Sequence, residues 1–331
     1  MTRSDINRET VDGFETTTDQ VLAGRRLDGV RAFVTGVSAG LGVETARALV
    51  AHGAHVIGAA RDLAKAERAT AAVREAAKEG GGTFEIVALD LADLASVRAC
   101  ADALVKRADP FDLVIANAGV MAAPFGHTTN GFETQFGTNH LGHFVLVNRI
   151  APLLRDGGRL VSLASSGHRF SDVDLDDPNF DRTPYDPWMA YGRSKTANIL
   201  FAVAFDHRHK DRGIRATAVH PGGIQTELGR HIGREEIQKM VDAINADLVA
   251  EGKTPRIWKT IPQGAATSIW AGVVADADAV GGKYCENCHV SHIVAEAKIS
   301  PVSEGVRPYA LDLEHAKLLW AKSEAMVDER F

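Results

Sequence analysis

Two side chains that lie four positions apart could act together in proton transfer. Tyr191 and Lys195 fall in residues 188–205, where small residues and an apolar second half favour a helix. Positions i and i+4 of a helix share one face, which brings the phenol and the amine within reach of each other. A phenol has a pKa of about 10, and a fixed ammonium beside it favours the phenolate. We therefore expect Lys195 to lower the pKa of Tyr191. A solvated lysine beside a half-buried tyrosine is the ordinary alternative.

A glycine-rich turn near the start of the chain could bind a dinucleotide. Gly36, Gly40 and Gly42 follow a β-prone run at 31–35 and precede a helical pattern that continues to about His52. The first glycine permits a tight turn, the second lets the backbone approach a pyrophosphate, and the third lets the helix pack against the strand. The helix N-terminus then directs unpaired N–H groups at the phosphates. The spacing differs from Gly-x-Gly-x-x-Gly, and a plain surface loop is the alternative.

The end of the next strand indicates which dinucleotide is preferred. A carboxylate there would bind the ribose 2′-hydroxyl of NAD, whereas an arginine accommodates the 2′-phosphate of NADP. Residues 54–60 read as this strand, and Arg61 follows them, with no acid until Asp62. An Arg guanidinium can bind a phosphate with two parallel hydrogen bonds. We expect NADP(H) as the preferred cofactor, with NAD(H) as the alternative; packing of Arg61 over the adenine is the other use for this side chain.

Strand and helix patterns alternate along the chain. Strands are expected at 31–35, 54–60, 83–89, 111–116, 159–164 and 214–219. Helices are expected at about 62–79, 93–107, 131–154, 188–205 and 311–327. This alternation predicts a parallel sheet covered by helices on both faces. Residues 1–29 are expected to form a polar segment and a lead-in helix, and 30–331 a single domain.

The composition is that of an ordinary globular protein. The 331 residues are 45% hydrophobic and 24% charged, with a net charge of -6, which is enough chain to bury a core without a disulfide or metal. The mild acidity argues against nucleic acid or an anionic membrane as a partner. The first ten residues have no apolar signal core, and no stretch is apolar enough to span a bilayer. We therefore expect a cytoplasmic protein without a membrane span.

The cysteines do not predict a disulfide framework or a metal site. Cys285, Cys288 and His289 match the spacing for covalent haem attachment, but that chemistry needs export, for which we see no signal. A zinc site would need a second pair of ligands at suitable spacing. No metal is expected, and the two cysteines are expected near the end of a strand.

Six motifs occur in an order that is typical of one enzyme family. They are Thr35-Gly36-x-x-x-Gly40-x-Gly42, Asn117-Ala118-Gly119, Asn139 within 136–143, Ser165, Tyr191-x-x-x-Lys195 and Pro221-Gly222. Together they resemble the classical short-chain dehydrogenase/reductase family over residues 30–285. The closer resemblance is to its retinol-dehydrogenase-like branch. It rests on Ala60-Arg61-Asp62, Asn139-His-Leu-Gly-His-Phe144, Ser165-Ser-Gly-His168, Val219-His-Pro-Gly222, 262–267 and Gly281-Gly-Lys-Tyr284.

The resemblance implies a doubly wound, Rossmann-type α/β sheet in a single domain. It also implies an oxidoreductase that transfers hydride between NADP(H) and a carbonyl or alcohol of a hydrophobic small molecule. Tyr191 would be the acid–base group, and Lys195 would lower its pKa and bind the nicotinamide ribose. Ser165 would hold the substrate oxygen, with Ser166 as the alternative, and Asn139 would order a water that links Lys195 to solvent. The implied cofactor contacts are Gly36, Ser38, Gly40, Leu41, Gly42, Arg61, Asp90, Leu91, Asn117, Ala118, Gly119, Tyr191, Lys195, Pro221, Gly222, Ile224 and Thr226.

The segments that would shape the substrate site are the hardest to interpret. Residues 166–187 are acidic and resemble an insertion of the branch, and 223–261 are expected to form a helical lid. Apolar pocket candidates, for which plain packing is the alternative, are Phe170, Trp188, Met189 and Trp258. A homodimer is compatible with this interpretation. The alternative functions are an NAD-dependent alcohol dehydrogenase of the same fold and a catalytically silent nucleotide-binding regulator.

Overall fold

The strands form one sheet that runs through the centre of the molecule. The computed structural model describes residues 13–250, 252, 255, 258–295 and 303–331. Within them the strands are β1 (Arg31–Thr35), β2 (His55–Ala60), β3 (Thr83–Ala88), β4 (Phe111–Ala116), β5 (Leu154–Leu163), β6 (Arg215–His220), β7 (Tyr284–Glu286) and β8 (His289–Val290). Their order across the sheet is β3-β2-β1-β4-β5-β6-β7-β8. Only β8 is antiparallel to its neighbour.

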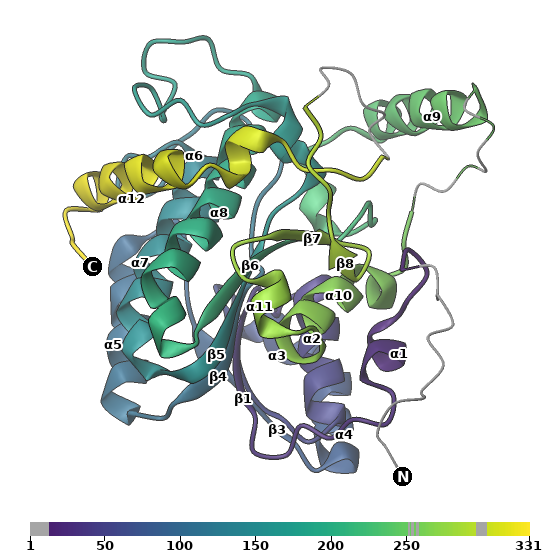
Figure 1. The fold of residues 1–331 in the computed structure, drawn as a ribbon, viewed down its shortest axis with the longest axis vertical. Helices are drawn as coiled ribbons and strands as arrows, with labels where there is room; N and C mark the ends of the chain where they lie inside the picture. Colours follow the sequence, from purple (N-terminus) through teal and green to yellow (C-terminus); the bar gives the residue numbers. More distant parts are fainter. Residues whose placement is uncertain (1–12, 251, 253–254, 256–257, 296–302) are drawn as a thin grey trace.

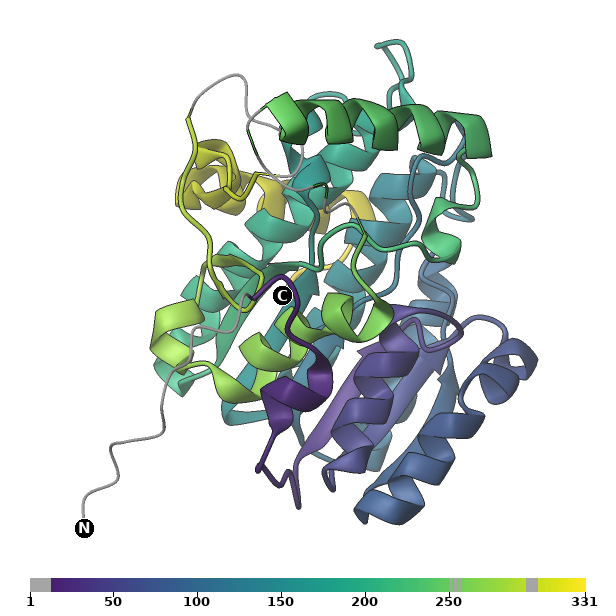
Figure 2. The same ribbon diagram turned by 90° about the vertical axis from the view of Figure 1, so that its right-hand side faces the viewer.

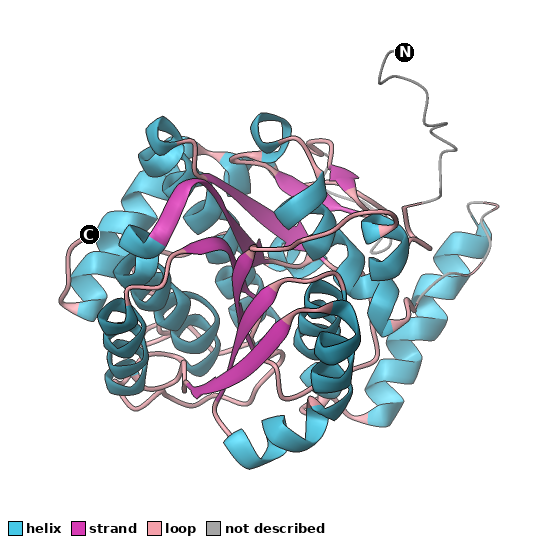
Figure 3. Cartoon of the chain, turned by 90° about the horizontal axis from the view of Figure 1, so that it is seen from below, coloured by secondary structure: helices cyan, strands magenta, loops and turns pink. Residues whose placement is uncertain are grey.

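Helices cover both faces of this sheet (Figures 1 and 3). The α-helices are α1 (Thr18–Leu22), α2 (Leu41–Ala51), α3 (Leu63–Ala69), α4 (Ala71–Gly80), α5 (Leu94–Arg107), α6 (Thr134–Phe136), α7 (Gly142–Ile150), α8 (Pro187–His209), α9 (Arg234–Ala250), α10 (Ile261–Ile269), α11 (Ala277–Val280) and α12 (Leu313–Val327). One buried apolar cluster packs α5, α7, α8 and α12 on one face, and a second packs α1, α2, α4 and α10 on the other. The predicted doubly wound, single-domain α/β fold is thus confirmed.

The order of the strands creates a place where a ligand can bind. The chain runs from β1 outward to β3 and then returns to β4, which lies beside β1 on its other side. Loops that follow β1 and β4 therefore leave the sheet in opposite directions and open a crevice beyond the carboxyl ends of the strands. The glycine turn follows β1, and Asn117-Ala118-Gly119 follows β4. Two of the predicted motifs therefore meet at this crevice.

Several predicted element boundaries were wrong for local reasons. The helix expected over 131–154 begins only at Thr134, because the Glu133 carboxylate caps it by accepting from the N–H groups of Gln135 and Phe136. At its other end β5 already starts at Leu154. The helix expected over 62–79 is two helices, α3 and α4, that meet at Thr70.

The short hairpin β7–β8 was not predicted. Its two loop residues, Asn287 and Cys288, both have positive φ, 48° and 57°. Two-residue hairpin loops favour that conformation because its twist matches that of the strands. Cysteine is an unusual residue there, so the sequence carried no turn signal. Cys285 lies in β7, which confirms that the two cysteines lie near the end of a strand.

An ion pair attaches this hairpin to the segment that follows it. His289 Nε2 lies 3.0 Å from a carboxylate oxygen of Glu304. Their hydrogen bond raises the pKa of His289 from 6.5 to about 9 and lowers the pKa of Glu304 from 4.5 to about 2. The stabilisation from His289 is complete below pH 6.5 and is lost as the pH rises through 9, whereas that from Glu304 is complete above pH 4.5 and is lost as the pH falls through 2.

We expect this pair to stabilise the protein most between pH 4.5 and 6.5. The Glu304→Gln variant removes the charge but keeps an oxygen for Asn287, which now donates to Glu304. Because both partners are partly exposed, the variant should lose only about 0.5–1 kcal/mol of unfolding free energy in that range. Denaturant unfolding at about pH 5.5 and about pH 9.5 measures the difference. An equal loss at both pH values would contradict the assignment.

The segment expected to form a lid contains helix α9 and a short 3-10 helix, Glu227–Gly229. In Figures 1 and 2, α9 lies at the opposite end of the molecule from α4. Part of 251–257, within the expected lid, and residues 1–12, expected to be polar and unstructured, lie outside the described residues. The function of this segment as a lid stays a prediction. None of the helices in the described ranges combines the length and apolar character needed to cross a bilayer.

Candidate active site

The glycine turn after β1 is packed so tightly that its glycines cannot be replaced without a shift. Gly36 and Gly40 have positive φ, 80° and 60°. A Cβ at Gly42 would collide with the carbonyl oxygen of Gly36 and lie 2.7 Å from Asn117 Nδ2. The N-terminus of α2 therefore lies against the turn after β4, with its first N–H groups at the crevice. Such a cradle fits the pyrophosphate of a dinucleotide.

A chain of hydrogen bonds connects this turn to the turn after β4. The N–H groups of Asn117 and Ala118 donate to Thr35 Oγ1, at 2.9 and 3.0 Å. Thr35 Oγ1 also lies 2.9 Å from His143 Nε2, and His143 Nδ1 lies 2.9 Å from the carbonyl oxygen of Asn139. A carbonyl only accepts, so Nδ1 carries the proton and Nε2 accepts from the Thr35 hydroxyl. Burial lowers the pKa of His143 to about 4, which keeps its ring neutral within this series of hydrogen bonds.

Asn139 lies in a five-residue π-helix, Gly137–Leu141, within the run that leads into α7. Such bulges are frequent at functional sites. Its side-chain amide is fully engaged: Oδ1 accepts from Val120 N, and Nδ2 donates to Val120 O and to Ser194 Oγ. Ser194 is the neighbour of Lys195 on α8, and Asn139 thus connects the turn after β4 to the helix of Tyr191.

Tyr191 and Ser165 meet at the carboxyl end of β5. The Tyr191 side chain is almost completely buried, and Ser165 Oγ lies beside its ring, because both would contact a Cβ at Gly167. Ser165 Oγ also accepts from the Gly167 N–H at 3.0 Å, which starts the 3-10 helix Ser166–Phe170. Only a glycine fits at 167, because a Cβ there would lie 2.7 Å from the Tyr191 ring. The structure brings Ser165 to Tyr191, whereas the main-chain N–H of Ser166 is bonded to His220.

The expected effect of Lys195 on Tyr191 is wrong for this structure. Burial raises the pKa of Tyr191 from 10.0 to about 12, and the hydrogen bond from Ser165 lowers it by less. Lys195 Nζ lies 5.7 Å from the centre of the Tyr191 ring and donates at 3.0 Å to the carbonyl oxygen of Leu163. Lys195 is itself buried, which lowers its pKa from 10.5 to about 8. The predicted juxtaposition is present, but desolvation dominates the titration of both groups.

At the end of β2 the two candidate cofactor residues have different surroundings. Asp62 Oδ1 accepts from Lys65 N at 2.9 Å and so caps α3. Arg61 is exposed beside it. One oxygen of the Asp62 carboxylate is thus bonded to the helix end, and both side chains are exposed. Lys65 forms an ion pair with Glu227 from the loop after β6.

The other predicted cofactor contacts lie along the same edge. Thr226 packs against the glycine turn, since a Cβ at Gly40 would lie 3.2 Å from its methyl group. Ile224 packs where a Cβ of Gly264 would lie, which brings the loop after β6 against α10. Asp90 follows β3 and accepts from Ala92 N at 2.9 Å. Leu91 is buried against α7, Ser38 lies in the glycine turn, Leu41 begins α2, Gly119 ends the turn after β4, and Pro221 and Gly222 follow β6.

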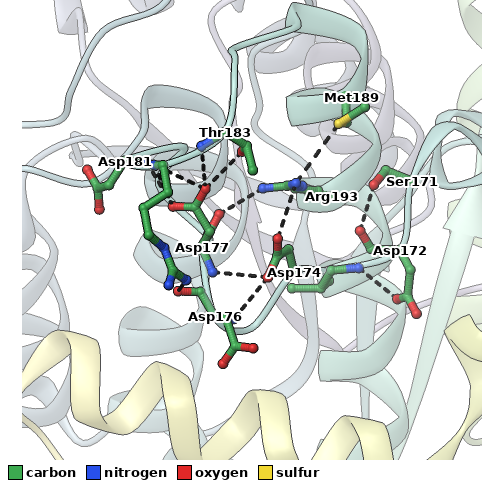
Figure 4. Close-up of polar contacts among 11 residues, drawn as sticks. Ser171, Asp172, Asp174, Asp176, Asp177, Asp181, Thr183, Met189 and Arg193 are labelled. Carbon is green, nitrogen blue, oxygen red and sulfur yellow. Dashed lines mark hydrogen bonds and ion pairs between the residues drawn. The ribbon is translucent and has the colours of Figure 1, made fainter.

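The acidic segment between β5 and α8 is a folded loop, shown in Figure 4. The Asp177 carboxylate accepts from the N–H groups of 181–183 and from the Thr183 hydroxyl. Arg193 of α8 donates to the Asp177 carbonyl oxygen at 2.7 Å and lies 3.5 Å from the Asp174 carboxylate. Its guanidinium also lies 4.0 Å from the centre of the Phe180 ring. Arg193 thus fixes this loop to the helix of Tyr191.

Three contributors to the site were missed at the sequence level. His143 and Arg193 connect the loops as described, and His220 accepts from the N–H groups of Ser166 and Gly222. The sequence did offer one indication of the two histidines, because His143 lies in the motif segment 136–143 and His220 in the motif segment 219–222. No three His, Cys, Asp or Glu side chains are grouped as metal ligands among the described residues.

Comparison with known protein families and relatives gives a consistent assignment. A family model described as short chain dehydrogenase matches residues 31–237. A Streptomyces lividans protein named as a probable oxidoreductase is 42% identical over 300 residues, which cover 89% of this chain and 96% of that protein. Human retinol dehydrogenase 14 is 34% identical over 314 residues, which cover 91% of this chain and 87% of that protein. These matches confirm the predicted resemblance to this family and to its retinol-dehydrogenase-like branch.

Solved structures show the same fold. An uncharacterized protein from Mycobacterium paratuberculosis superposes with a TM-score of 0.70 at 32% identity, over 94% of this chain and 98% of that one. A short chain dehydrogenase from Burkholderia cenocepacia in complex with NADP superposes with a TM-score of 0.60 at 25% identity, over 79% of this chain and 97% of that one.

Proposed function

The chain belongs to the short chain dehydrogenase family, and from that premise we propose that it is an NADP(H)-dependent oxidoreductase for hydrophobic carbonyl or alcohol substrates. The observation that carries this proposal is the meeting of Tyr191, Ser165 and Lys195 beside the glycine cradle. A phenol, a hydroxyl and an amine at the carboxyl edge of such a sheet can serve one reaction, in which a carbonyl oxygen gains a proton while its carbon gains a hydride.

Tyr191 would be the acid–base group of this reaction. Its hydroxyl would give a proton to the carbonyl oxygen during reduction and take it back during oxidation. Ser165, which lies beside the Tyr191 ring, would donate to the same oxygen and orient it. A raised pKa suits the reductive direction, because the phenol stays protonated at neutral pH until a substrate accepts the proton. Nicotinamide supplies or accepts the hydride when the dinucleotide is bound.

Lys195 and Asn139 would assist this proton transfer. Lys195 Nζ is fixed by the Leu163 carbonyl, and we assign it to the nicotinamide ribose. The side chain of Asn139 is held on both sides, which fixes its main-chain segment near Lys195 through Ser194. We propose that this segment binds a water molecule that exchanges protons with Lys195.

The residues at the crevice would hold the dinucleotide. The glycine turn would receive the pyrophosphate, Asp90 and Leu91 would flank the adenine, and Pro221–Thr226 would border the carboxamide. Arg61 would bind the 2′-phosphate, because it is exposed at the end of β2 while Asp62 caps α3. The short chain dehydrogenase from Burkholderia cenocepacia was solved in complex with NADP, which supports the choice of a dinucleotide with a 2′-phosphate.

We expect Arg61→Ala to reduce the preference for NADPH. A charge-assisted hydrogen bond to a phosphate is worth about 1.5–3 kcal/mol, so KM for NADPH should rise by about tenfold to a hundredfold. KM for NADH, which has no 2′-phosphate, should change by less than about twofold. Arg68→Ala, which removes an exposed arginine from the adjacent helix α3, is the matched control for net charge. An unchanged ratio of the two KM values in Arg61→Ala would remove the basis for an NADP(H) assignment.

Exposed apolar side chains near Tyr191 support a hydrophobic substrate. Phe170 is 56% exposed and Met189 is 39% exposed. Phe170 packs edge-on against Trp188, with ring centres 5.7 Å apart, and lies close to Gly192, the neighbour of Tyr191. A hydrophobic ligand that covers these side chains gains binding free energy, because apolar surface is removed from water.

A substrate panel tests the proposed function. Purified protein would be assayed with NADPH and a series of aldehydes and ketones of increasing apolar length, and with NADP+ and the matching alcohols. We expect turnover that grows with apolar length. If NADPH binds tightly but no carbonyl or alcohol turns over, the protein is a silent nucleotide-binding regulator and the proposal is wrong.

A further inference from the structure

His220 is the last residue of β6 and lies between two loops of the candidate site. Its Nδ1 atom lies 3.2 Å from the main-chain nitrogen of Ser166 and 3.4 Å from that of Gly222. Both nitrogens belong to backbone N–H groups, which can only donate. Nδ1 must therefore be the unprotonated nitrogen, and the proton of a neutral imidazole lies on Nε2.

His220 connects the loop that contains Ser166 with the turn that contains Gly222, because its Nδ1 accepts a hydrogen bond from each. Ser166 adjoins Ser165, which lies beside the Tyr191 ring, and Gly222 lies in the turn after β6, where its φ is 94°. Strands β5 and β6 pair up to Leu163 and Val219, and the last backbone bond between them runs from Ala164 N to Val219 O at 2.8 Å. One step further along, His220 Nδ1 accepts from the N–H of Ser166 and so continues the connection.

The surroundings of His220 keep it neutral. Burial lowers its pKa well below 6.5, and the nearby charged or titratable groups act in the same direction. Those groups are Arg169, Lys259, His168 and Lys195. A second proton on Nδ1 would remove the acceptor for both N–H groups, so a neutral ring is what this connection requires.

We propose that His220 is a positioning residue that ties the loop of Ser165 to the loop Pro221–Thr226 through its Nδ1 acceptor. The inference rests on the proposed function, which assigns the first loop to the substrate oxygen and the second to the nicotinamide carboxamide. A displacement of either loop would change the distance between the carbonyl and the nicotinamide, to which reaction rates are very sensitive. His220 touches neither group and acts through the main chain of its two neighbours.

Two substitutions separate the acceptor from the bulk of the ring. His220→Asn places an amide oxygen near the position of Nδ1 and can accept from the same N–H groups. His220→Leu fills similar space and accepts nothing. Neither variant keeps the Nε2–H at the far end of the ring, and only His220→Asn keeps an acceptor near the position of Nδ1. A thermal unfolding transition in each variant would show that both fold, even if the unfolding temperature of His220→Leu is the lower one.

Hydrogen exchange of the cofactor-free protein is the first test. A backbone N–H that loses its acceptor exchanges faster with solvent. We expect exchange in the peptides covering 165–167 and 221–223 to be several-fold faster in His220→Leu than in the wild-type protein, and unchanged in His220→Asn. Equal exchange in all three proteins would overturn the proposal, whether or not the protein is active.

Cofactor affinity and turnover are the second test. We expect His220→Leu to raise the Kd for NADPH by about tenfold and to lower kcat by about tenfold, because two hydrogen bonds are lost. His220→Asn should stay within about twofold of the wild-type protein in both. A simple loss of stability would lower the active fraction and leave the Kd unchanged. Equal impairment of the two variants would show that the acceptor is irrelevant and would overturn the proposal, whereas failure of the proposed function would appear as inactivity of the wild-type protein.

Discussion

Tyr191→Phe is expected to lower kcat/KM for carbonyl reduction by about a thousandfold, since a positioned general acid contributes about 10²–10⁴. The substitution removes one hydroxyl and keeps the ring, which fills the space over Gly167. The unfolding temperature and the Kd for NADPH should therefore remain close to the wild-type values. Steady-state kinetics, thermal unfolding and fluorescence titration with NADPH measure the three quantities.

Tyr309→Phe is the matched control for this variant. Burial raises the pKa of Tyr309 to about 12, as it does for Tyr191, but the Tyr309 hydroxyl donates to the His168 carbonyl oxygen at 2.7 Å. This variant should retain kcat/KM within about threefold, with a small loss of stability. If Tyr191→Phe kept more than a tenth of the wild-type activity, a different group would have to supply the proton.

Lys195→Met is expected to lower activity by about a hundredfold or more while the protein becomes more stable at neutral pH. Burial lowers the pKa of Lys195 from 10.5 to about 8, so holding the ammonium in the fold is unfavourable below pH 8. This cost fades as the pH rises from 8 to 10.5, because the buried amine then stays neutral. Removing the amine should raise the unfolding free energy by about 2 kcal/mol at pH 7. Activity should fall because the proposed contact of the amine with the nicotinamide ribose is lost at the same time.

The gain in stability depends on whether the Leu163 carbonyl oxygen keeps a hydrogen-bond donor when the amine is removed. It accepts from Lys195 Nζ and also from Asn198 Nδ2, at 3.0 and 2.9 Å, so it keeps one partner in Lys195→Met. Asn198→Ala removes the other bond without changing a charge and should lower activity by less than about tenfold. Denaturant unfolding at about pH 7 and about pH 10 follows the stability. A destabilised but active Lys195→Met would contradict a catalytic function for this amine.

The sequence was sufficient to predict the scaffold because its signals are local. Gly36, Gly40 and Gly42 occupy positions where a turn and a close helix require glycine, and this requirement can be recognised without a structure. The same holds for the spacing of Tyr191 and Lys195 on one helix face. The alternation of strands and helices then placed both motifs at one edge of a parallel sheet.

What the sequence could not provide depends on contacts between distant segments. The pKa of Tyr191 follows from how deeply the fold buries it, and its expected decrease was wrong for that reason. The hydrogen bonds of His143 to Thr35 and of His220 to Ser166 join positions that lie far apart in the chain, so the sequence did not indicate them. The β7–β8 hairpin was missed because Cys288 is not a residue that predicts positive φ.

The most direct test of the central claim follows a single hydride and a single proton donor. NADPH with deuterium at both C4 positions of the nicotinamide would be incubated with the best carbonyl of the panel, and the alcohol would be analysed by mass spectrometry. The account predicts one deuterium on the carbinol carbon of the product from the wild-type protein, and a rate reduced by about a thousandfold in Tyr191→Phe. A product without deuterium, or an equal rate in the variant, would contradict it.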